Sequence, residues 1–176
     1  MEFIETKIKG AFVIEPERLV DERGFFARIW SRDEFKDRGL NPSLVQSSIS
    51  FNKKKGTLRG MHCQSPPHAE AKLVRCTLGA IYDVILDLRP DSPSFKQWFS
   101  VELSAENRKE LYIPEGVAHG FQTLADNTEV SYQISEFHHP ESARGVRWND
   151  PDFGIRWPLP VTVISPKDSA YEGWKL

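Results

Sequence analysis

The sequence predicts an all-β fold, a sandwich or barrel of antiparallel strands with a few short helices. Glycine and proline, 11 and 12 in number, divide the 176 residues at short intervals, and the stretches between them are rich in Val, Ile, Phe, Trp and Tyr. Turn residues that alternate with such stretches every 8–12 residues or so are typical of all-β sandwiches and barrels. The predicted strands lie within residues 10–16, 25–30, 72–78, 80–88, 97–103, 110–116 and 129–135.

One segment, residues 31–40, has the pattern of a short helix. Ser31 is suited to be its N-cap, Glu34 completes a capping box three residues later, and Gly39 provides the stop. The proline-rich tail from residue 149 onward is expected to cover the surface as an ordered loop. We find no internal repeat, low-complexity tract or linker in the sequence, and therefore predict a single domain over residues 1–176.

The composition limits the classes of partner. Charged residues make up 27% of the chain and the formal net charge is −2, which gives no general attraction to nucleic acid or to anionic membranes. No apolar run approaches the ~20 residues that a membrane span needs, and no secretory signal is visible. With two cysteines, Cys63 and Cys76, we expect a reduced, cytoplasmic protein rather than a disulfide scaffold.

Two acidic residues fall within one predicted strand. Asp83 and Asp87 are four residues apart in "AIYDVILDL", so both side chains point to the same face. An inward face would make a polar cavity, whereas an outward face would be solvated surface. From the alternation alone we expect the outward arrangement.

Two of the five histidines occur in informative contexts. "PEGVAH" is a proline–glycine turn that leads into a strand carrying His119, and an earlier predicted strand carries His62. This pattern is typical of a cupin-type double-stranded β-helix (jelly roll), in which two such strands often hold a metal. However, Gln64 stands where a second histidine ligand is usual, and strand alternation points Cys63 to the other face. His62 and His119, even with Glu70, are few ligands for a catalytic metal, so we expect none.

Basic residues accompany the histidines. Arg59, Lys72 and Arg75 lie on neighbouring strand-like stretches, and Arg23 follows an acidic turn. Arginine presents a planar fork that suits phosphate oxygens, and lysine supplies a compact positive charge. Because these residues alternate with histidine, proline and aromatic residues, they favour a pocket for a phosphorylated small molecule over a solvated basic surface.

Several motifs together resemble the dTDP-4-dehydrorhamnose 3,5-epimerase family. They are "GTLRGMH" followed by Gln64, "KLVR", "IYDV", "ELSAEN", "LYIPEG" followed by "AHGF", and "ARG" followed by "RW", and the likeness runs from about residue 4 to residue 170. The resemblance implies a cupin-like jelly roll that uses no metal or other cofactor and works as a homodimer. It also implies a substrate, a nucleotide-diphosphate 4-keto-6-deoxyhexose that is epimerised at C3, C5 or both.

The same resemblance implies roles for individual residues. His62, paired with Asp168, would be the base, Lys72 would stabilise the enolate, and Tyr132 would be the acid. The positions assigned to substrate binding are Arg23, Phe26, Gln46, Arg59, Gln64, Asp83, His119, His138, Arg144 and Lys167. Of these, Arg23 and Arg59 match contacts to the diphosphate, while His119 and Asp83 match a second polar pair in the pocket.

The proposed chemistry needs these residue types. A 4-keto group acidifies the hydrogens on C3 and C5, and imidazole, whose ordinary pKa is about 6.5, is suited to abstract them near neutral pH. A carboxylate on its far nitrogen fixes the tautomer and favours the imidazolium. An ammonium at the C4 oxygen can lower the barrier by about 3 kcal/mol, as other oxyanion donors do. Inversion requires a proton donor on the opposite face, a role that fits Tyr132.

Five positions depart from the usual members of the family: His138 stands for Tyr, Cys63 for Tyr, Glu70 for Gln, Arg28 for Glu and Ser48 for Asn. The residues assigned to catalysis are retained, whereas positions associated with recognition of the substrate are altered. This leaves open another nucleotide, another 4-keto sugar, or epimerisation at C3 or C5 alone. A nucleotide-sugar 3,4-ketoisomerase, a non-catalytic sugar-nucleotide binder and a metal-dependent oxygenase are the competing functions.

Overall fold

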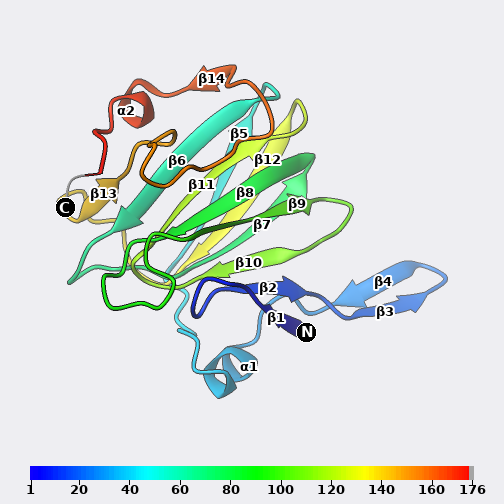
Figure 1. The fold of residues 1–176 in the computed structure, drawn as a ribbon. Helices are drawn as coiled ribbons and strands as arrows, with labels where there is room; N and C mark the ends of the chain where they lie inside the picture. Colours follow the sequence, from blue (N-terminus) through cyan, green and yellow to red (C-terminus); the bar gives the residue numbers. More distant parts are fainter. Residues whose placement is uncertain (175–176) are drawn as a thin grey trace.

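Two sheets face each other in the structure, a computed structural model that describes residues 1–174 (Figure 1). The strands of the first sheet, in chain order, are β1 (Glu2–Glu5), β2 (Phe12–Glu15), β5 (Gln46–Asn52), β7 (Lys72–Leu78), β10 (Glu110–Ile113) and β12 (Thr128–Ile134). Those of the second are β6 (Thr57–Gln64), β8 (Ala80–Asp87), β9 (Trp98–Ser104), β11 (Val117–Thr123) and β13 (Ala143–Gly145). Their spatial orders are β1-β2-β10-β7-β12-β5 and β13-β6-β11-β8-β9, with antiparallel neighbours throughout.

Five short elements complete the fold of the described residues. β3 (Arg18–Asp21) and β4 (Gly24–Ala27) form a separate hairpin, β14 (Val163–Ile164) adds to β6 in parallel, and the helices are α1 (Arg32–Asp37) and α2 (Pro166–Ser169). The predicted all-β jelly roll with short helices is confirmed, although the strand expected over residues 25–30 ends at Ala27. No helix within residues 1–174 is long and apolar enough to cross a membrane.

The main core lies between the two sheets. Val74 and Val130 of the first sheet meet Ile81, Ile85 and Phe121 of the second, and each is at most 1% exposed. Because strand side chains alternate, the same strands leave their other side chains on the outer faces. Each fully buried Val, Ile or Phe contributes about 1.5–3 kcal/mol relative to an exposed one.

Helix α1 covers part of the outer face of the first sheet. Phe35, 1% exposed, packs edge-on against Phe3 and Tyr112. The helix prediction is confirmed, but the predicted capping box is wrong, because the Ser31 side chain makes no capping hydrogen bond. Glu34 instead faces cations, with its carboxylate 3.5 Å from the N-terminal ammonium and 3.6 Å from Arg28.

The C-terminal tail covers the outer face of the second sheet, as predicted. Phe153, Trp157 and Trp174 pack in a cluster with Met61 and Leu86. The tail is not purely loop, since it contributes β14 and α2. Its course past β6 brings residues 163–169 next to the middle of the chain, a placement that matters for the site described below (Figure 1).

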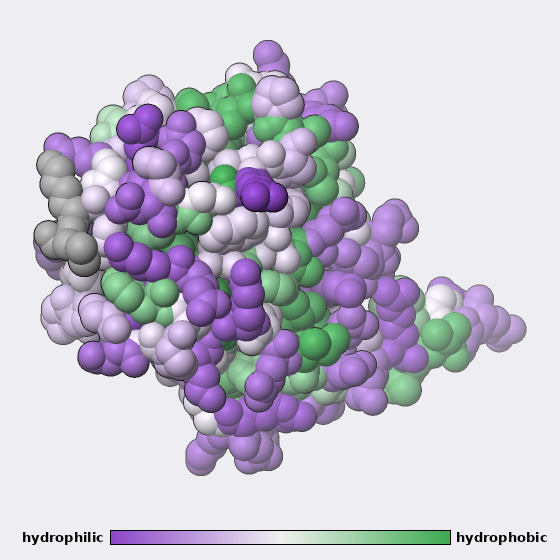
Figure 2. Space-filling model, in the orientation of Figure 1, coloured by the Kyte–Doolittle hydropathy of each residue, from purple (hydrophilic) through white to green (hydrophobic). Residues whose placement is uncertain are grey.

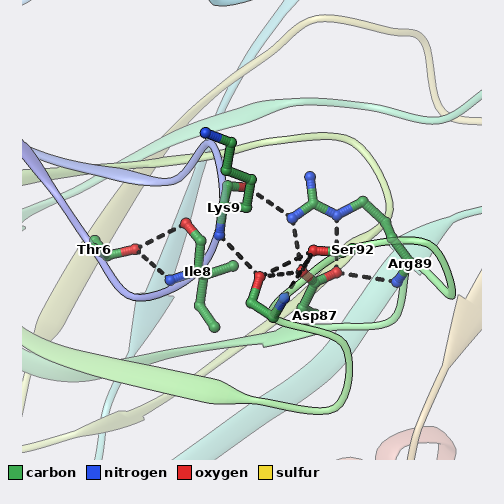
Figure 3. A network of polar contacts seen from close by, with 7 residues as sticks. Thr6, Ile8, Lys9, Asp87, Arg89 and Ser92 are labelled. Carbon is green, nitrogen blue, oxygen red and sulfur yellow. Dashed lines mark hydrogen bonds and ion pairs between the residues drawn. The ribbon is translucent and has the colours of Figure 1, made fainter.

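The expectation that Asp83 and Asp87 face solvent is wrong, because both are completely buried. Asp83 points into the core between Ile81 and Ile85, on the face that these side chains share. Asp87 accepts hydrogen bonds from Arg89, Ser92 and Ser94 (Figure 3). Burial raises its pKa, but these donors outweigh burial and bring the pKa down to about 2.

The β3–β4 hairpin extends away from both sheets (Figure 1). Leu19, Val20 and Phe26 are 69%, 76% and 70% exposed, and Figure 2 shows apolar side chains on this protruding arm. Exposed apolar side chains that are gathered in this way mark a surface that another molecule can cover.

Candidate active site

A cavity of about 320 Å³ opens where β6 meets the C-terminal tail and the ends of the first sheet's strands. Sequence-predicted residues account for most of its lining. Those that it brings together are Gln46, Arg59, His62, Gln64, Lys72, His138, Arg144, Lys167 and Asp168. They come from β5, β6, β7, β13, α2 and the segment after β12, so both sheets and the tail contribute.

His62 and Asp168 form the predicted pair. His62 Nε2 lies 2.8 Å from Asp168 Oδ1, although the residues are 106 positions apart in the chain. The Asp168 Oδ2 atom accepts a hydrogen bond from the Gly60 backbone N–H at 3.1 Å, and Ser165 caps α2 by accepting from the Asp168 N–H. Burial raises the pKa of Asp168, but the hydrogen bonds from His62 and Gly60 outweigh it and lower the pKa below the ordinary value. Asp168 is therefore a fixed anion behind the imidazole.

Two glycines make room for this pair. Gly60 has φ +123°, and a Cβ there would lie 2.5 Å from the Gly120 Cα, so only glycine lets β6 and β11 approach so closely. A Cβ on Gly145 would lie 2.1 Å from the Tyr171 ring. Tyr171 can therefore lie over β13, where its ring is 6.0 Å from the His62 ring, edge-on.

Lys72 is held by two contacts. Its Nζ lies 2.8 Å from Glu70 Oε1 and donates to the His62 backbone oxygen at 3.4 Å. The Lys72 and Glu70 side chains are 12% and 5% exposed. The ammonium is therefore fixed beside His62, and a fixed positive charge of this kind is suited to stabilise an oxyanion.

A second histidine–carboxylate pair lies inside the barrel. His119 Nε2 is 2.6 Å from Asp83 Oδ1, and the side chains are 6% and 0% exposed. The Tyr132 ring lies 6.2 Å from the His119 ring, and its hydroxyl is 3.3 Å from Ser50 Oγ. Burial raises the pKa of Tyr132 above its ordinary value, which keeps the phenol protonated. These three predicted residues are not among the described residues that line the cavity.

Two other predicted residues make hydrogen bonds within the protein, Gln64 through its whole amide group and Arg59 through Nε. The Gln64 amide donates to the backbone oxygens of His68 and Phe137 and accepts from the His139 N–H. It thus organises the rim loops instead of offering polar atoms to a ligand. Arg59 lines the cavity, and its Nε donates to Asn52 Oδ1 at 2.7 Å, which fixes the guanidinium plane.

The predicted basic cluster is only partly assembled. Arg75 lies on the opposite face of β7 from Lys72 and is 3.8 Å from Glu110, so its inclusion was wrong. Arg23 and Phe26 lie on the β3–β4 hairpin, and Arg23 pairs with Asp21 at 2.6 Å. The structure does not bring Arg23 or Phe26 to the cavity of their own chain. Cys63 packs against the outer cluster, as alternation predicted, and also borders the cavity.

Sequence reasoning did not assign several of the cavity residues to the site, among them Glu70, Glu136, Ser165 and Tyr171. Glu70 was considered only as a possible metal ligand and as a departure from the family, yet it is the acidic partner of Lys72. Ser165 and Tyr171 flank Asp168 at the cavity wall. A signal for Ser165 was present, since Ser-Pro is typical of an N-cap followed by the first helical residue. No local pattern indicated Tyr171.

His62 and His119 are the imidazoles that would share a metal in a metal-binding cupin, but here each has a carboxylate partner of its own. His62 and His119 are register neighbours on β6 and β11, but each uses Nε2 to contact its own carboxylate. A cupin barrel with a half-exposed imidazole, an anionic partner and a fixed ammonium in one cavity has the groups that an enzyme needs to move protons to and from a bound molecule.

Comparison with known proteins identifies the group of enzymes. The family model described as dTDP-4-dehydrorhamnose 3,5-epimerase matches residues 5–175. The enzyme of that name from Methanothermobacter thermautotrophicus is 44% identical over 176 residues, covering 98% of this chain and 92% of the relative. The chain therefore belongs to the dTDP-4-dehydrorhamnose 3,5-epimerase family and is an isomerase of the epimerase class.

Solved structures agree in fold and carry ligands. The epimerase from Bacillus anthracis, with TDP and PPi bound, has a TM-score of 0.94 and 41% identity, covering 98% of this chain and 99% of that one. The Legionella pneumophila 3,5-epimerase in complex with dTDP-4-keto-L-rhamnose has a TM-score of 0.90 and 38% identity, covering 98% and 92%.

Proposed function

We propose that this enzyme epimerises a dTDP-linked 4-keto-6-deoxyhexose at C3, C5 or both, with His62 as the base. The observation that carries the proposal is the His62–Asp168 pair beside the Lys72 ammonium in one cavity. The ligands of the Bacillus and Legionella relatives support a dTDP-linked sugar as the substrate.

The first step is abstraction of a proton from carbon. Because a carboxylate can only accept, His62 Nε2–H donates to Asp168, and Nδ1 carries the free lone pair. Nδ1 takes the proton from C3 or C5, the C–H electron pair forms a C=C bond, and negative charge moves to the C4 oxygen. Asp168 stabilises the imidazolium and Lys72 stabilises the enolate.

The second step returns a proton to the opposite face. The Tyr132 phenol donates its proton to the carbon, the carbonyl re-forms, and solvent then reprotonates Tyr132 and deprotonates His62. No net proton or electron is gained or lost. Since Tyr132 lies further inside the barrel than the cavity lining, this step requires the sugar ring to reach inward toward His119.

Solvent deuterium uptake tests this function. The enzyme is incubated with dTDP-4-keto-6-deoxyglucose in deuterated water, and the product is examined by NMR. Deuterium at both C3 and C5 is the expected result, and label at one carbon identifies a single-site epimerase. A carbonyl moved to C3 would indicate a ketoisomerase, and a His62→Asn variant that still exchanges hydrogen would overturn the assignment of the base.

We further propose a homodimer in which the β3–β4 hairpin of one subunit reaches the cavity of the other. The exposed apolar side chains of the hairpin, and the fact that its residues are not among the described lining of their own chain's cavity, support this arrangement. It would let Arg23 and Phe26 bind the substrate. The test is complementation: Arg23→Ala and His62→Asn chains, each inactive alone, should regain activity when co-refolded, because a mixed dimer contains one intact site. A monomer by light scattering, or absence of complementation, would contradict the dimer.

The expected cytoplasmic location, the single domain over residues 1–176 and catalysis without a cofactor stay predictions. Activity that survives treatment with a chelator is the result expected for the last of these.

A further inference from the structure

A cluster of three potential metal ligands lies at the rim of the cavity, outside the catalytic set. His68, Glu136 and His139 each place a ligand atom within 4.8 Å of the others. His68 is in the loop between β6 and β7, whereas Glu136 and His139 follow β12. We propose that these three side chains form a site for Zn²⁺ that ties the two rim loops together.

The loops that carry the ligands are fixed by one buried side chain. Gln64, 6% exposed, donates to the backbone oxygen of His68 at 2.9 Å and accepts from the backbone N–H of His139 at 2.6 Å. The loops also bond directly, through Ser65 N–H and the Ser142 oxygen at 2.9 Å. Both histidine backbones are therefore held in place before any ion binds, which lowers the ordering cost of binding.

The two imidazoles are already in contact. The His68 and His139 rings stack with centroids 3.4 Å apart and planes 9° from parallel. The lone pair of an imidazole nitrogen lies in the plane of its ring, so the lone pairs of these two rings lie in nearly parallel planes, and a rotation about each Cβ–Cγ bond is needed to make them converge on an ion. That torsion has a broad minimum, so the rotation is easy.

A carboxylate outside the cluster orients one ligand. His139 Nδ1 lies 3.1 Å from Glu141 Oε1, so Nδ1–H donates to Glu141 and Nε2 is the unprotonated nitrogen. A ligating histidine whose other nitrogen donates to a carboxylate is the usual arrangement in zinc proteins. This contact is an observation independent of the cluster itself.

The donor set selects the class of ion. Two imidazole nitrogens and one carboxylate oxygen suit Zn²⁺, whereas Ca²⁺ and Mg²⁺ prefer oxygen ligands alone. Three protein ligands leave one tetrahedral position for water. Because Glu136 also lines the cavity, the ion would stand at the entrance used by the substrate, apart from His62 and His119.

Calorimetric titration of Zn²⁺ into untagged, chelator-treated protein tests the site. We expect one Zn²⁺ per chain, with affinity reduced about tenfold or more in each of His68→Ala, His139→Ala and Glu136→Gln. His138→Ala is the matched control, since it removes a neighbouring histidine from outside the cluster and should bind Zn²⁺ as the wild type does. His62→Asn should also bind normally.

Two further readouts guard against misfolded variants and adventitious binding. Co²⁺ should give the visible bands of a tetrahedral ion in the wild type and in His138→Ala but not in His68→Ala, and Zn²⁺ should raise the melting temperature of the same two proteins. Equal Zn²⁺ affinity in His68→Ala, His139→Ala and wild type would overturn the proposal. So would loss of binding in His62→Asn, or Mg²⁺ binding of the same strength.

Discussion

The barrel contains two histidine–carboxylate pairs that use the same atoms in different surroundings. His62 and Asp168 meet at 2.8 Å at the cavity, with the imidazole 41% exposed, and His119 and Asp83 meet at 2.6 Å inside the core. Asp168 also accepts from the Gly60 N–H, whereas Asp83 Oδ2 has no hydrogen-bond partner within residues 1–174. The pKa of Asp168 is accordingly lowered, while burial raises that of Asp83.

This difference shows that residue type and pairing do not fix the role of a carboxyl group. Additional donors lower the pKa of Asp168, so its carboxylate is an anion near neutral pH, next to an imidazole that is exposed to the cavity. Asp83 has the same partner type but lacks those donors, so burial dominates. The outer pair is therefore suited to proton abstraction and the inner pair to shaping the barrel interior.

The largest expected effect is the difference in kcat between the His62→Asn and His119→Asn variants. Loss of the base should reduce kcat by about 10³-fold, since general base catalysis contributes 10²–10⁴-fold. His119→Asn should cost less, because its side chain does not line the cavity. Steady-state kinetics and deuterium exchange measure both, with circular dichroism as the control for folding. Equal losses would show that the two pairs share the proton transfer.

Tyr132→Phe should separate the two halves of the reaction. Without the phenol, inversion should fall by about 10²-fold or more. The His62–Asp168 pair is untouched, so the substrate should still exchange hydrogen with deuterated water while keeping its configuration. NMR of recovered substrate measures this exchange. Loss of exchange and inversion to the same extent would mean that Tyr132 is not the second proton donor.

The two aspartates should respond differently when replaced by asparagine. Asp168→Asn removes charge-assisted hydrogen bonds and should destabilise the fold by about 1.5–3 kcal/mol at pH 7. Asp83→Asn should cost less, because burial already disfavours the charged form of Asp83. Urea unfolding of both variants is the measurement. A larger loss for Asp83→Asn would contradict the contrast drawn between the pairs.

Glu110 extends the comparison to the outer face of the first sheet. Like Asp83 it is buried and has one oxygen without a hydrogen-bond partner within residues 1–174, and burial raises its pKa to about 8 despite Arg75 nearby. A carboxyl group whose pKa is raised by folding stabilises the fold fully at pH values below its pKa in the unfolded chain, about 4.3. This stabilisation is lost as the pH rises through the pKa in the folded chain, about 8. The glutamine of Glu110→Gln does not titrate. The free energy of unfolding of this variant should therefore rise by about 1 kcal/mol or more relative to that of the wild type between pH 5 and pH 9.

The measurement is urea unfolding of both proteins across that range, and a constant difference between them would mean that Glu110 stays charged in the fold.

Local sequence patterns predicted much of the fold, because the formation of a strand or a short helix depends mainly on residues that are near neighbours in the chain. Stretches rich in Val, Ile and aromatic residues between turn residues placed the strands around Val74 and Ile85, and residues 31–40 predicted α1. The family motifs predicted that His62 would lie beside Lys72 and Arg59 at one cavity, and the structure has this arrangement.

Burial and long-range contacts were decided by the tertiary structure. Alternation shows that Asp83 and Asp87 share a face, but it cannot tell which face the second sheet covers, and the expectation of exposure failed for that reason. Tyr171 reaches His62 only because the tail returns along β6 and Gly145 leaves room for its ring.

The sequence by itself thus determined the strand pattern and the short helix, since each is recorded in residues close together in the chain, while the role of His62 as the base stays a prediction from the family motifs. The tertiary structure alone decided in which direction the pKa of each buried carboxyl group is shifted and that the described lining of the cavity lacks the chain's own Arg23. These properties depend on donors, solvent and surfaces contributed by residues far apart in the sequence.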